Sequence, residues 1–158
     1  MRTERADPLE ESKILVRSLR PGDLENVIAL DAKIVGRRRE EYFKLKLEHA
    51  LRETGIEISL AAEIEGVFAG ILLARVFYGE FGILEQVAVL DTMGVHPEFE
   101  GRGIASAMLE QLVKNLGALG ISRLQTEVAW DDQKLLSFFQ HEGFKPAPRF
   151  CLDLDLGT

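Results

Sequence analysis

Two spacings of hydrophobic and polar residues along the chain predict an ordered series of strands and helices. Alternating or continuous apolar runs predict strands at residues 14–19, 59–64, 67–78, 86–95, 123–129 and 150–156. Apolar positions three and four residues apart predict helices from residue 24, at about 38–52, after residue 103 and at 134–142. This order, with its consecutive hairpin strands, predicts an α/β fold with a mixed sheet.

The helix after Gly103 has the clearest amphipathic pattern in the chain. Gly120 is expected to end it, and the pair Glu65-Gly66 is expected to form a tight hairpin turn between two strands. The predicted apolar stripe of the helix comprises Ala105, Met108, Leu109, Leu112, Val113, Leu116 and Leu119. We therefore expect one side of this helix to pack on the sheet.

One acidic residue interrupts the apolar face of the predicted strand at residues 86–95. Side chains alternate between the two faces of a strand, so every second residue is expected to share a face. The face in question comprises Val87, Val89, Asp91, Met93 and Val95. A carboxylate in such a row makes Asp91 a candidate functional residue.

The segment at residues 95–105, with the sequence VHPEFEGRGIA, predicts a phosphate-binding loop. Gly101 and Gly103 let backbone N–H groups approach a ligand, and the dipole of the helix that follows favours an anion. Nucleotide motifs fit poorly, because no Lys-Ser/Thr pair follows the glycines and Ser106 stands where a dinucleotide fingerprint has its third glycine. The alternative is a strand–turn–helix connection whose glycines serve only tight packing.

The pattern Val95-x-Pro97-x-x-x-Gly101-x-Gly103-Ile104-Ala105 resembles the acetyl-CoA loop of the GNAT superfamily of acyl-CoA N-acyltransferases. Residues 126–144, which end in Gly-Phe, resemble the strand–loop–helix segment of the same family. The order of elements also agrees over nearly the whole chain. The resemblance implies a three-layer α/β/α domain at residues 13–158, after a polar tail at 1–12. Its mixed, mostly antiparallel twisted sheet would be splayed between its two central parallel strands.

The resemblance also implies the reaction and the residues that bind its co-substrate. An acetyl group would pass from acetyl-CoA to a primary amine of a small molecule, a peptide N-terminus or a lysine, by direct attack in a ternary complex. The backbone of Met93, Gly94 and Val95 would bind the pantetheine arm. The remaining residues implied in acetyl-CoA binding are Glu100, Gly101, Arg102, Gly103, Ile104, Ala105, Ser106, Asp132 and Phe139.

Three positions depart from the family pattern. Glu100 stands where Gln or Arg is usual, so its carboxylate is expected to point to solvent, away from a pyrophosphate. Asp132 replaces a frequent Asn and is alternatively the N-cap of the next helix. Phe139 replaces a Tyr whose phenol protonates the departing thiolate, which leaves Tyr42 or Tyr78 as the substitute if a phenol is required.

Two carboxylates are candidates for the general base that deprotonates the acceptor amine. The resemblance implies Glu127 or Asp91, and a base acting through water is a further alternative. The structural alternatives are a solvated strand face for Glu127 and a buried, hydrogen-bonded carboxylate for Asp91. The basic run at residues 37–39 is interpreted as a solvated helix start, with an acidic acceptor as its other possible ligand.

Composition limits the other function classes. Nineteen basic against 26 acidic residues give a formal net charge of −7, which argues against general nucleic-acid binding. The single cysteine, Cys151, excludes an internal disulfide, favours a reducing compartment and is expected in the core of the last strand. The polar start of the chain, its short apolar runs and the absence of metal-ligand spacing among the histidines predict a cytoplasmic protein without membrane, nucleic-acid or metal partners. Dimers are common in the resembled family, and a catalytically weak acyl-CoA-binding module is the alternative to an enzyme.

Overall fold

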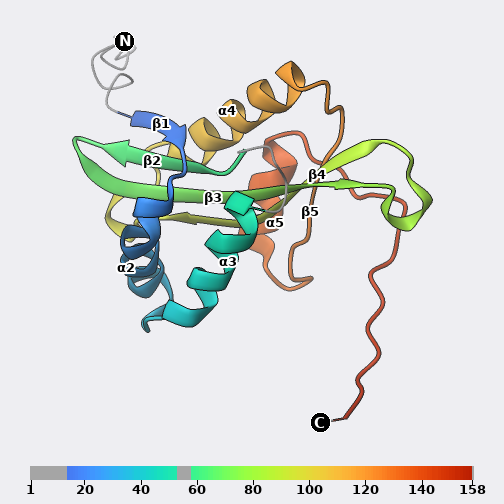
Figure 1. Cartoon of the computed structure of the whole chain (residues 1–158), viewed down its shortest axis with the longest axis horizontal. Coiled ribbons are helices and arrows are strands. Elements are labelled where there is room, and N and C mark those ends of the chain that lie inside the picture. The colour runs from blue at the N-terminus through green and yellow to red at the C-terminus, as the bar shows by residue number, and fades with distance from the viewer. Residues whose placement is uncertain (1–13, 53–57, 158) are drawn as a thin grey trace, which may run out of the picture. The chain divides into compact units, whose positions relative to one another are not determined.

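The computed structural model describes residues 14–52 and 58–157. The predicted tail at residues 1–12 lies outside this described part. In chain order the elements are β1 (Ile14–Ser18), α2 (Leu24–Val35), α3 (Glu40–Arg52), β2 (Leu60–Ile64), β3 (Val67–Tyr78), β4 (Gln86–Val95), α4 (Ile104–Ala118), β5 (Leu124–Thr126) and α5 (Gln133–His141) (Figure 1). The predicted helices and all predicted strands but the last are confirmed, but the strand predicted at residues 123–129 is shortened to Leu124–Thr126.

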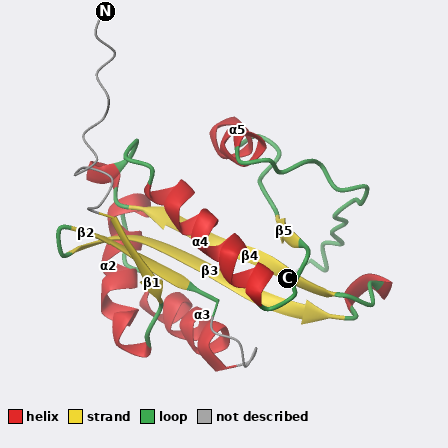
Figure 2. Ribbon diagram, turned by 90° about the horizontal axis from the view of Figure 1, so that it is seen from above, coloured by secondary structure: helices red, strands yellow, loops and turns green. Residues whose placement is uncertain are grey.

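The five strands form one mixed sheet in the order β1-β2-β3-β4-β5. Neighbouring strands from β1 to β4 are antiparallel, while β4 and β5 are parallel (Figure 2). The predicted hairpin between β2 and β3 is confirmed, since Glu65 and Gly66 both adopt positive φ, 50° and 79°. The sheet is therefore mostly antiparallel, with one parallel pair at its end.

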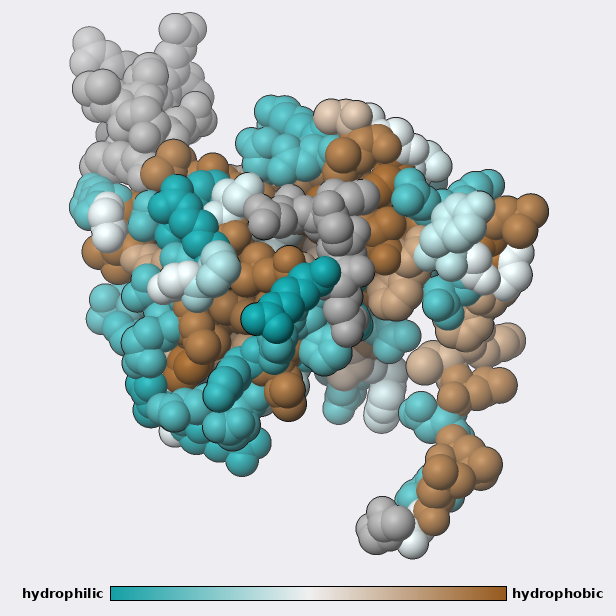
Figure 3. Space-filling view, viewed as in Figure 1, coloured by the Kyte–Doolittle hydropathy of each residue, from teal (hydrophilic) through white to brown (hydrophobic). Residues whose placement is uncertain are grey.

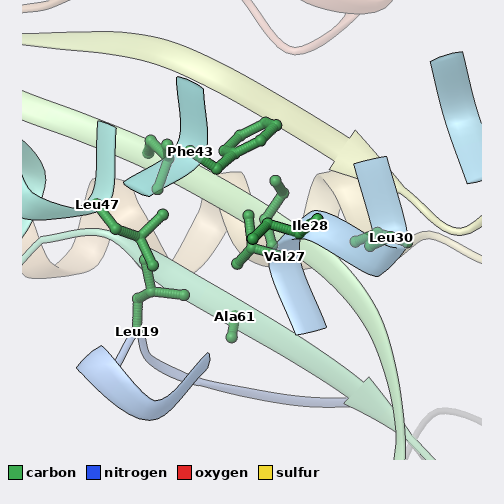
Figure 4. Close-up of a cluster of buried hydrophobic side chains, with 9 residues drawn as sticks. Leu19, Val27, Ile28, Leu30, Phe43, Leu47 and Ala61 are labelled. Atoms are coloured by element: carbon green, nitrogen blue, oxygen red, sulfur yellow. The ribbon is translucent and has the colours of Figure 1, made fainter. Parts of the chain in front are cut away.

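The described chain forms two compact units, Met1–Glu127 and Val128–Thr158. In the first unit, α2 and α3 cover one face of the sheet and α4 covers the other, which gives three layers (Figure 1). Side chains from α2, α3 and the sheet meet in a buried cluster between the first two layers (Figure 4). The cluster comprises Leu19, Val27, Ile28, Leu30, Phe43, Leu47, Ala61, Ile71 and Leu73.

Helix α4 packs directly on β3 because Gly70 has no side chain at the crossing. A Cβ atom at Gly70 would lie 3.0 Å from Ile104 Cγ2 and 3.0 Å from Met108 Cε. The predicted stripe of α4 is confirmed at its centre, where Met108 and Leu112 are fully buried, whereas Val113 is 54% exposed. Close packing at Gly70 fixes the start of α4 over the sheet.

A buried ion pair joins β1 to the turn that precedes α2. The guanidinium of Arg17 donates two hydrogen bonds of 2.8 Å to the carboxylate of Asp23, which is only 5% exposed. The Arg20 N–H donates a further bond of 2.8 Å to the same carboxylate. These bonds, above all those from Arg17, lower the pKa of Asp23 below its ordinary value of 3.8. The pair is one of the polar contacts that fix α2 against the sheet.

The predicted strand at residues 150–156 is wrong, and Cys151 is exposed rather than buried in a core. Apolar residues still recur at every second position, because Phe150, Leu152 and Leu154 are separated by Cys151 and Asp153. Phe150, Leu152 and Leu154 are 94%, 88% and 84% exposed. Figure 3 shows hydrophobic residues on the surface of the C-terminal segment. No described strand pairs with this segment. Alternation allows a strand, but hydrogen bonds from a neighbouring strand are needed to form one.

Candidate functional site

An extra residue in β4 forms a β-bulge at Asp91. Leu90 pairs with Ala74 of β3 and Thr92 pairs with Leu73, so Asp91 has no partner residue of its own. The side chains of Asp91 and Thr92 lie together, with Thr92 Oγ1 donating a hydrogen bond of 3.1 Å to Asp91 Oδ2. The bulge therefore interrupts the regular alternation of β4 at the candidate carboxylate.

The bulge also corrects the predicted face of β4. Paired residues on antiparallel strands point to the same face. Thr92 beside Asp91 pairs with Leu73, which belongs to the cluster under α2 and α3, whereas Val95 pairs with Gly70 under α4. The prediction that Asp91 shares a face with Met93 and Val95 is wrong, because the extra residue reverses the alternation.

The backbone of β4 beyond the bulge presents hydrogen-bonding groups at its outer edge. His96 N–H donates to Ala69 O of the neighbouring strand at 2.8 Å. Since backbone groups alternate along an antiparallel strand, Gly94 also faces β3, while the N–H and C=O groups of Met93 and Val95 face the opposite edge. Of the three residues predicted to bind pantetheine, Met93 and Val95 thus have suitably directed groups.

The outer edge of β4 is uncovered in the first unit because the parallel strands separate. The last β4–β5 pair is Leu90 with Thr126, joined further by a 2.9 Å hydrogen bond from Thr126 Oγ1 to Leu90 O. Beyond this pair β4 continues to Val95, whereas β5 ends at Thr126. Asp91 and Glu127 are the first residues past the separation, which we call the fork. The structure thus places both candidate bases at the fork, with Glu127 exposed.

Both glycines of the loop before α4 adopt a left-handed backbone conformation. Gly101 and Gly103 adopt φ angles of 79° and 81°, and a Cβ atom at either would meet nothing within 4 Å. Gly103 is the N-cap of α4 and no side chain caps the helix. The first bond of the helix runs from Ala107 N–H to Gly103 O at 2.9 Å, so the N–H groups of Ile104 and Ala105 precede the helical bonds. This exposed helix start suits an anion.

The charged side chains of the loop point into solvent. Glu100 and Arg102 are both exposed, and the guanidinium carbon of Arg102 lies 5.2 Å from the centroid of the Phe99 ring. Among the described residues, the first turn of α4 contains no acidic side chain. A phosphate at the helix start would therefore meet backbone N–H groups and Arg102, while Glu100 can stay in water.

A pocket of about 290 Å³ lies on the face of the sheet that α2 and α3 cover, between α3 and strands β3 and β4. Asp91 forms its border at the fork, and Lys46 Nζ lies 2.5 Å from Asp91 Oδ2. The same ammonium lies 5.6 Å from the centroid of the Tyr42 ring. The lining comprises Tyr42, Leu45, Lys46, His49, Ala50, Leu73, Arg75 and Asp91.

Comparison with known families identifies this arrangement. Residues 24–144 match the Acetyltransferase (GNAT) family, which is most of the chain and includes the glycine loop, the fork and the pocket. The chain belongs to the GNAT acetyltransferase family. The predicted family and its class of activity, acyl-CoA-dependent N-acetyl transfer, are thereby confirmed.

Solved structures of similar fold agree with this GNAT assignment. The aminoglycoside N-acetyltransferase AAC(6')-Iy in complex with CoA has a TM-score of 0.74 at 18% identity, over 91% of this chain and 95% of that one. The ribosomal-protein-S18-alanine N-acetyltransferase from Escherichia coli has a TM-score of 0.69 at 20% identity, over 85% and 79%. A transcriptional regulator from Bacillus halodurans C-125 has a TM-score of 0.74 at 18% identity, over 90% and 99%. At these identities the similarity shows the GNAT fold alone.

Arg75 in the pocket of this GNAT domain was not anticipated from the sequence. Its Nε atom is buried and has no hydrogen-bond partner among the described residues. The guanidinium carbon lies 5.2 Å from the Phe77 ring centroid. The sequence contains one indication of a special role, because Arg75 is the one charged residue in the otherwise apolar run Val67–Tyr78.

Two of the three arginines that precede α3, Arg38 and Arg39, form ion pairs. Arg39 donates hydrogen bonds of 2.8 and 2.5 Å to the buried carboxylate of Asp31, which raises the pKa of Arg39. Arg38 pairs with Glu25 and Glu40 at 2.8 and 3.0 Å. The solvated helix start fits Arg38, whose side chain is 48% exposed, but Arg39 instead joins α2 to α3.

The second unit contains two more of the predicted residues. Asp132 is the N-cap of α5, because its Oδ1 accepts a hydrogen bond of 3.1 Å from Leu135 N–H. Phe139 is 3% exposed, and its ring centroid lies 4.9 Å from that of Phe144 and 5.3 Å from that of Phe138. The capping alternative for Asp132 is thus confirmed, and Phe139 forms part of an aromatic core.

The described part of the chain lacks two kinds of feature. Residues 14–52 and 58–157 contain no group of three or more His, Cys, Asp or Glu side chains arranged to hold a metal ion. None of the helices in these residues is long and apolar enough to cross a membrane.

Proposed function

We propose that the protein transfers an acetyl group from acetyl-CoA to a primary amine by direct attack in a ternary complex. The observation that carries this proposal is the fork, where the uncovered edge of β4 lies between the pocket and the strand end that leads to the glycine loop. An ammonium acceptor and acetyl-CoA would give the acetamide, free CoA thiol and one proton. The amine nitrogen forms the new bond to the carbonyl carbon while the carbon–sulfur bond breaks.

Acetyl-CoA would bind along the edge of β4 and at the start of α4. The outward backbone groups of Met93 and Val95 suit the amide groups of a pantetheine arm, in the manner of an added strand. The N–H groups around Gly103 and the side chain of Arg102 suit the pyrophosphate. The CoA complex of the aminoglycoside N-acetyltransferase with this fold supports the choice of ligand.

Proton transfer is assigned to the carboxylates at the fork. We place Glu127 as the general base, because it is exposed and forms no ion pair with a described residue, whereas Asp91 already binds Lys46. Asp91 remains the second candidate. Phe139 cannot donate a proton, but a thiol pKa of about 8.5 makes the CoA thiolate a tolerable leaving group without one. Tyr42, in the pocket lining, is the phenol best placed to replace the missing acid, since Tyr78 is 73% exposed.

Calorimetry with acetyl-CoA and a CoA-release assay over a panel of amines together test this function. We expect measurable heat of acetyl-CoA binding and CoA release with at least one amine. Binding without release across the panel would favour the alternative of a catalytically weak acyl-CoA-binding module. Absence of binding would contradict both.

We also propose that the chain forms a homodimer through its C-terminal segment at residues 150–156. Phe150, Leu152, Leu154 and Leu156 are each at least 83% exposed, and an exposed apolar row of this kind is typical of an interface. Light scattering is expected to give about twice the chain mass of 17.7 kDa. Leu154→Asp is expected to give the mass of one chain, and a monomeric unmodified protein would contradict the proposal.

Two further assignments complete the proposal. Residues 13–158 act as one acetyltransferase domain, which is supported by the family match over residues 24–144. The protein acts in the cytoplasm, which is supported by its single, exposed cysteine, Cys151.

A further inference from the structure

The pocket beside the fork has one cation more than its described side chains can neutralise. Lys46 and Asp91 form an ion pair of 2.5 Å, so their charges balance. Arg75 has no ion pair with a described residue, and its buried Nε lacks a hydrogen-bond partner. Arg75 lines the pocket without a carboxylate of the described residues beside its guanidinium. An anionic group of a ligand would supply the missing counter-ion.

We propose that the acceptor amine also carries a carboxylate, and that Arg75 binds this carboxylate. The proposal rests on the acetyltransferase function above and specifies the acceptor of the same site. A guanidinium binds a carboxylate through two parallel hydrogen bonds, which fixes its orientation as well as its position. Arg75 is thus a specificity-determining residue, and the proposal makes no change to the transfer step.

The position of Arg75 relative to the fork suits such a molecule. Arg75 pairs with Val89, which is two residues before Asp91 on β4 and hence about 7 Å along the strand. An amine placed at the fork would therefore have its carboxylate on the side of Arg75, within the reach of an arginine side chain. The acceptor would lie along β4 between these two points.

The size and apolar lining of the pocket narrow the class further. A volume of about 290 Å³ is at the small end for ligand pockets, which favours a molecule of amino-acid size over an oligosaccharide. The side chains of Leu45, Ala50 and Leu73 form an apolar part of the pocket wall. We therefore expect a small amino acid with an apolar side chain, acetylated on its amino group. A polycationic acceptor would instead be repelled by Arg75.

Matched acceptors test the carboxylate directly. In the CoA-release assay, kcat/KM for leucine is expected to exceed that for leucinamide, which has the same side chain and amine, at least tenfold. Arg75→Gln is expected to raise KM for leucine at least tenfold and to leave KM for leucinamide within twofold. Arg75→Lys keeps the charge without the paired donors. Its KM for leucine is expected to lie between that of the unmodified protein and that of Arg75→Gln.

Controls separate this inference from the proposed function. Arg123→Gln removes an exposed arginine outside the pocket and is expected to leave both KM values unchanged. Calorimetry with acetyl-CoA and thermal unfolding of each variant verify that the co-substrate site and the fold persist. Equal activity on leucine and leucinamide, or an unchanged KM for leucine in folded Arg75→Gln and Arg75→Lys, would overturn the carboxylate proposal alone. No CoA release with any amine would instead overturn the proposed function.

Discussion

Replacement of Gly103 by valine is expected to raise the dissociation constant for acetyl-CoA about 100-fold, or about 2.7 kcal/mol. Gly103 has φ of 81°, a conformation that costs an ordinary L-residue about 1–2 kcal/mol and a β-branched residue more. A valine would relieve this strain by turning the backbone, which redirects the N–H groups at the start of α4. Its two methyl groups would also stand where a phosphate is expected to approach. Calorimetry with acetyl-CoA measures the change.

Gly117 provides a matched control in the same helix. It has no positive φ, and a Cβ atom there would meet nothing within 4 Å, as at Gly103. Gly117→Ala is expected to stabilise the fold by about 0.5–1 kcal/mol and to leave acetyl-CoA affinity unchanged. An unchanged affinity in folded Gly103→Val would contradict the placement of the pyrophosphate at the start of α4.

Replacement of Glu127 by glutamine is expected to lower kcat about 100-fold while the dissociation constant for acetyl-CoA stays within twofold. Glutamine keeps the shape of the side chain but cannot accept the proton of the acceptor amine. Since Glu127 follows Thr126, the last residue paired with β4, its loss should affect the chemistry at the fork and not the glycine loop. Steady-state kinetics over a range of pH measures the effect, and the acidic limb of the profile is expected to disappear.

Two other carboxylates make this result interpretable. Glu110→Gln removes an exposed carboxylate on α4 that pairs with Lys114, and it is expected to leave kcat unchanged. Asp91→Asn tests the second candidate at the fork. Full activity in Glu127→Gln together with a 100-fold loss in Asp91→Asn would transfer the role of base to Asp91.

Much of the fold could be predicted because local patterns coincide with tertiary packing. The turn at Glu65-Gly66 forms as expected. The stripe on α4 does so at its centre, where Met108 and Leu112 are buried. The positive φ angles of Gly101 and Gly103 agree with the expected glycine loop, because glycine adopts this conformation without strain, while its ligand stays a prediction. In these cases the residue type and the backbone geometry favour the same local structure.

Other features depend on contacts between distant segments, which the alternation of apolar and polar residues along a segment does not reveal. The bulge at Asp91 is set by the register of β4 against β3, so the faces of Met93 and Val95 were predicted incorrectly. Arg75 gains its significance only from the residues that surround it across the pocket. Likewise, residues 150–156 have the pattern of a strand, but a strand also requires a neighbour.

The single extra residue in β4 has a consequence for the order of events. Because of the bulge, Asp91 and Val95 point to opposite faces of the sheet. On the proposed placement, the sheet therefore separates the co-substrate from the acceptor, and the two meet at the fork. Each molecule then has its own entrance, and each product can leave by the route through which its precursor arrived. Neither substrate needs to wait for the other, and an inhibitor that occupies both sites has to be joined through the gap between β4 and β5.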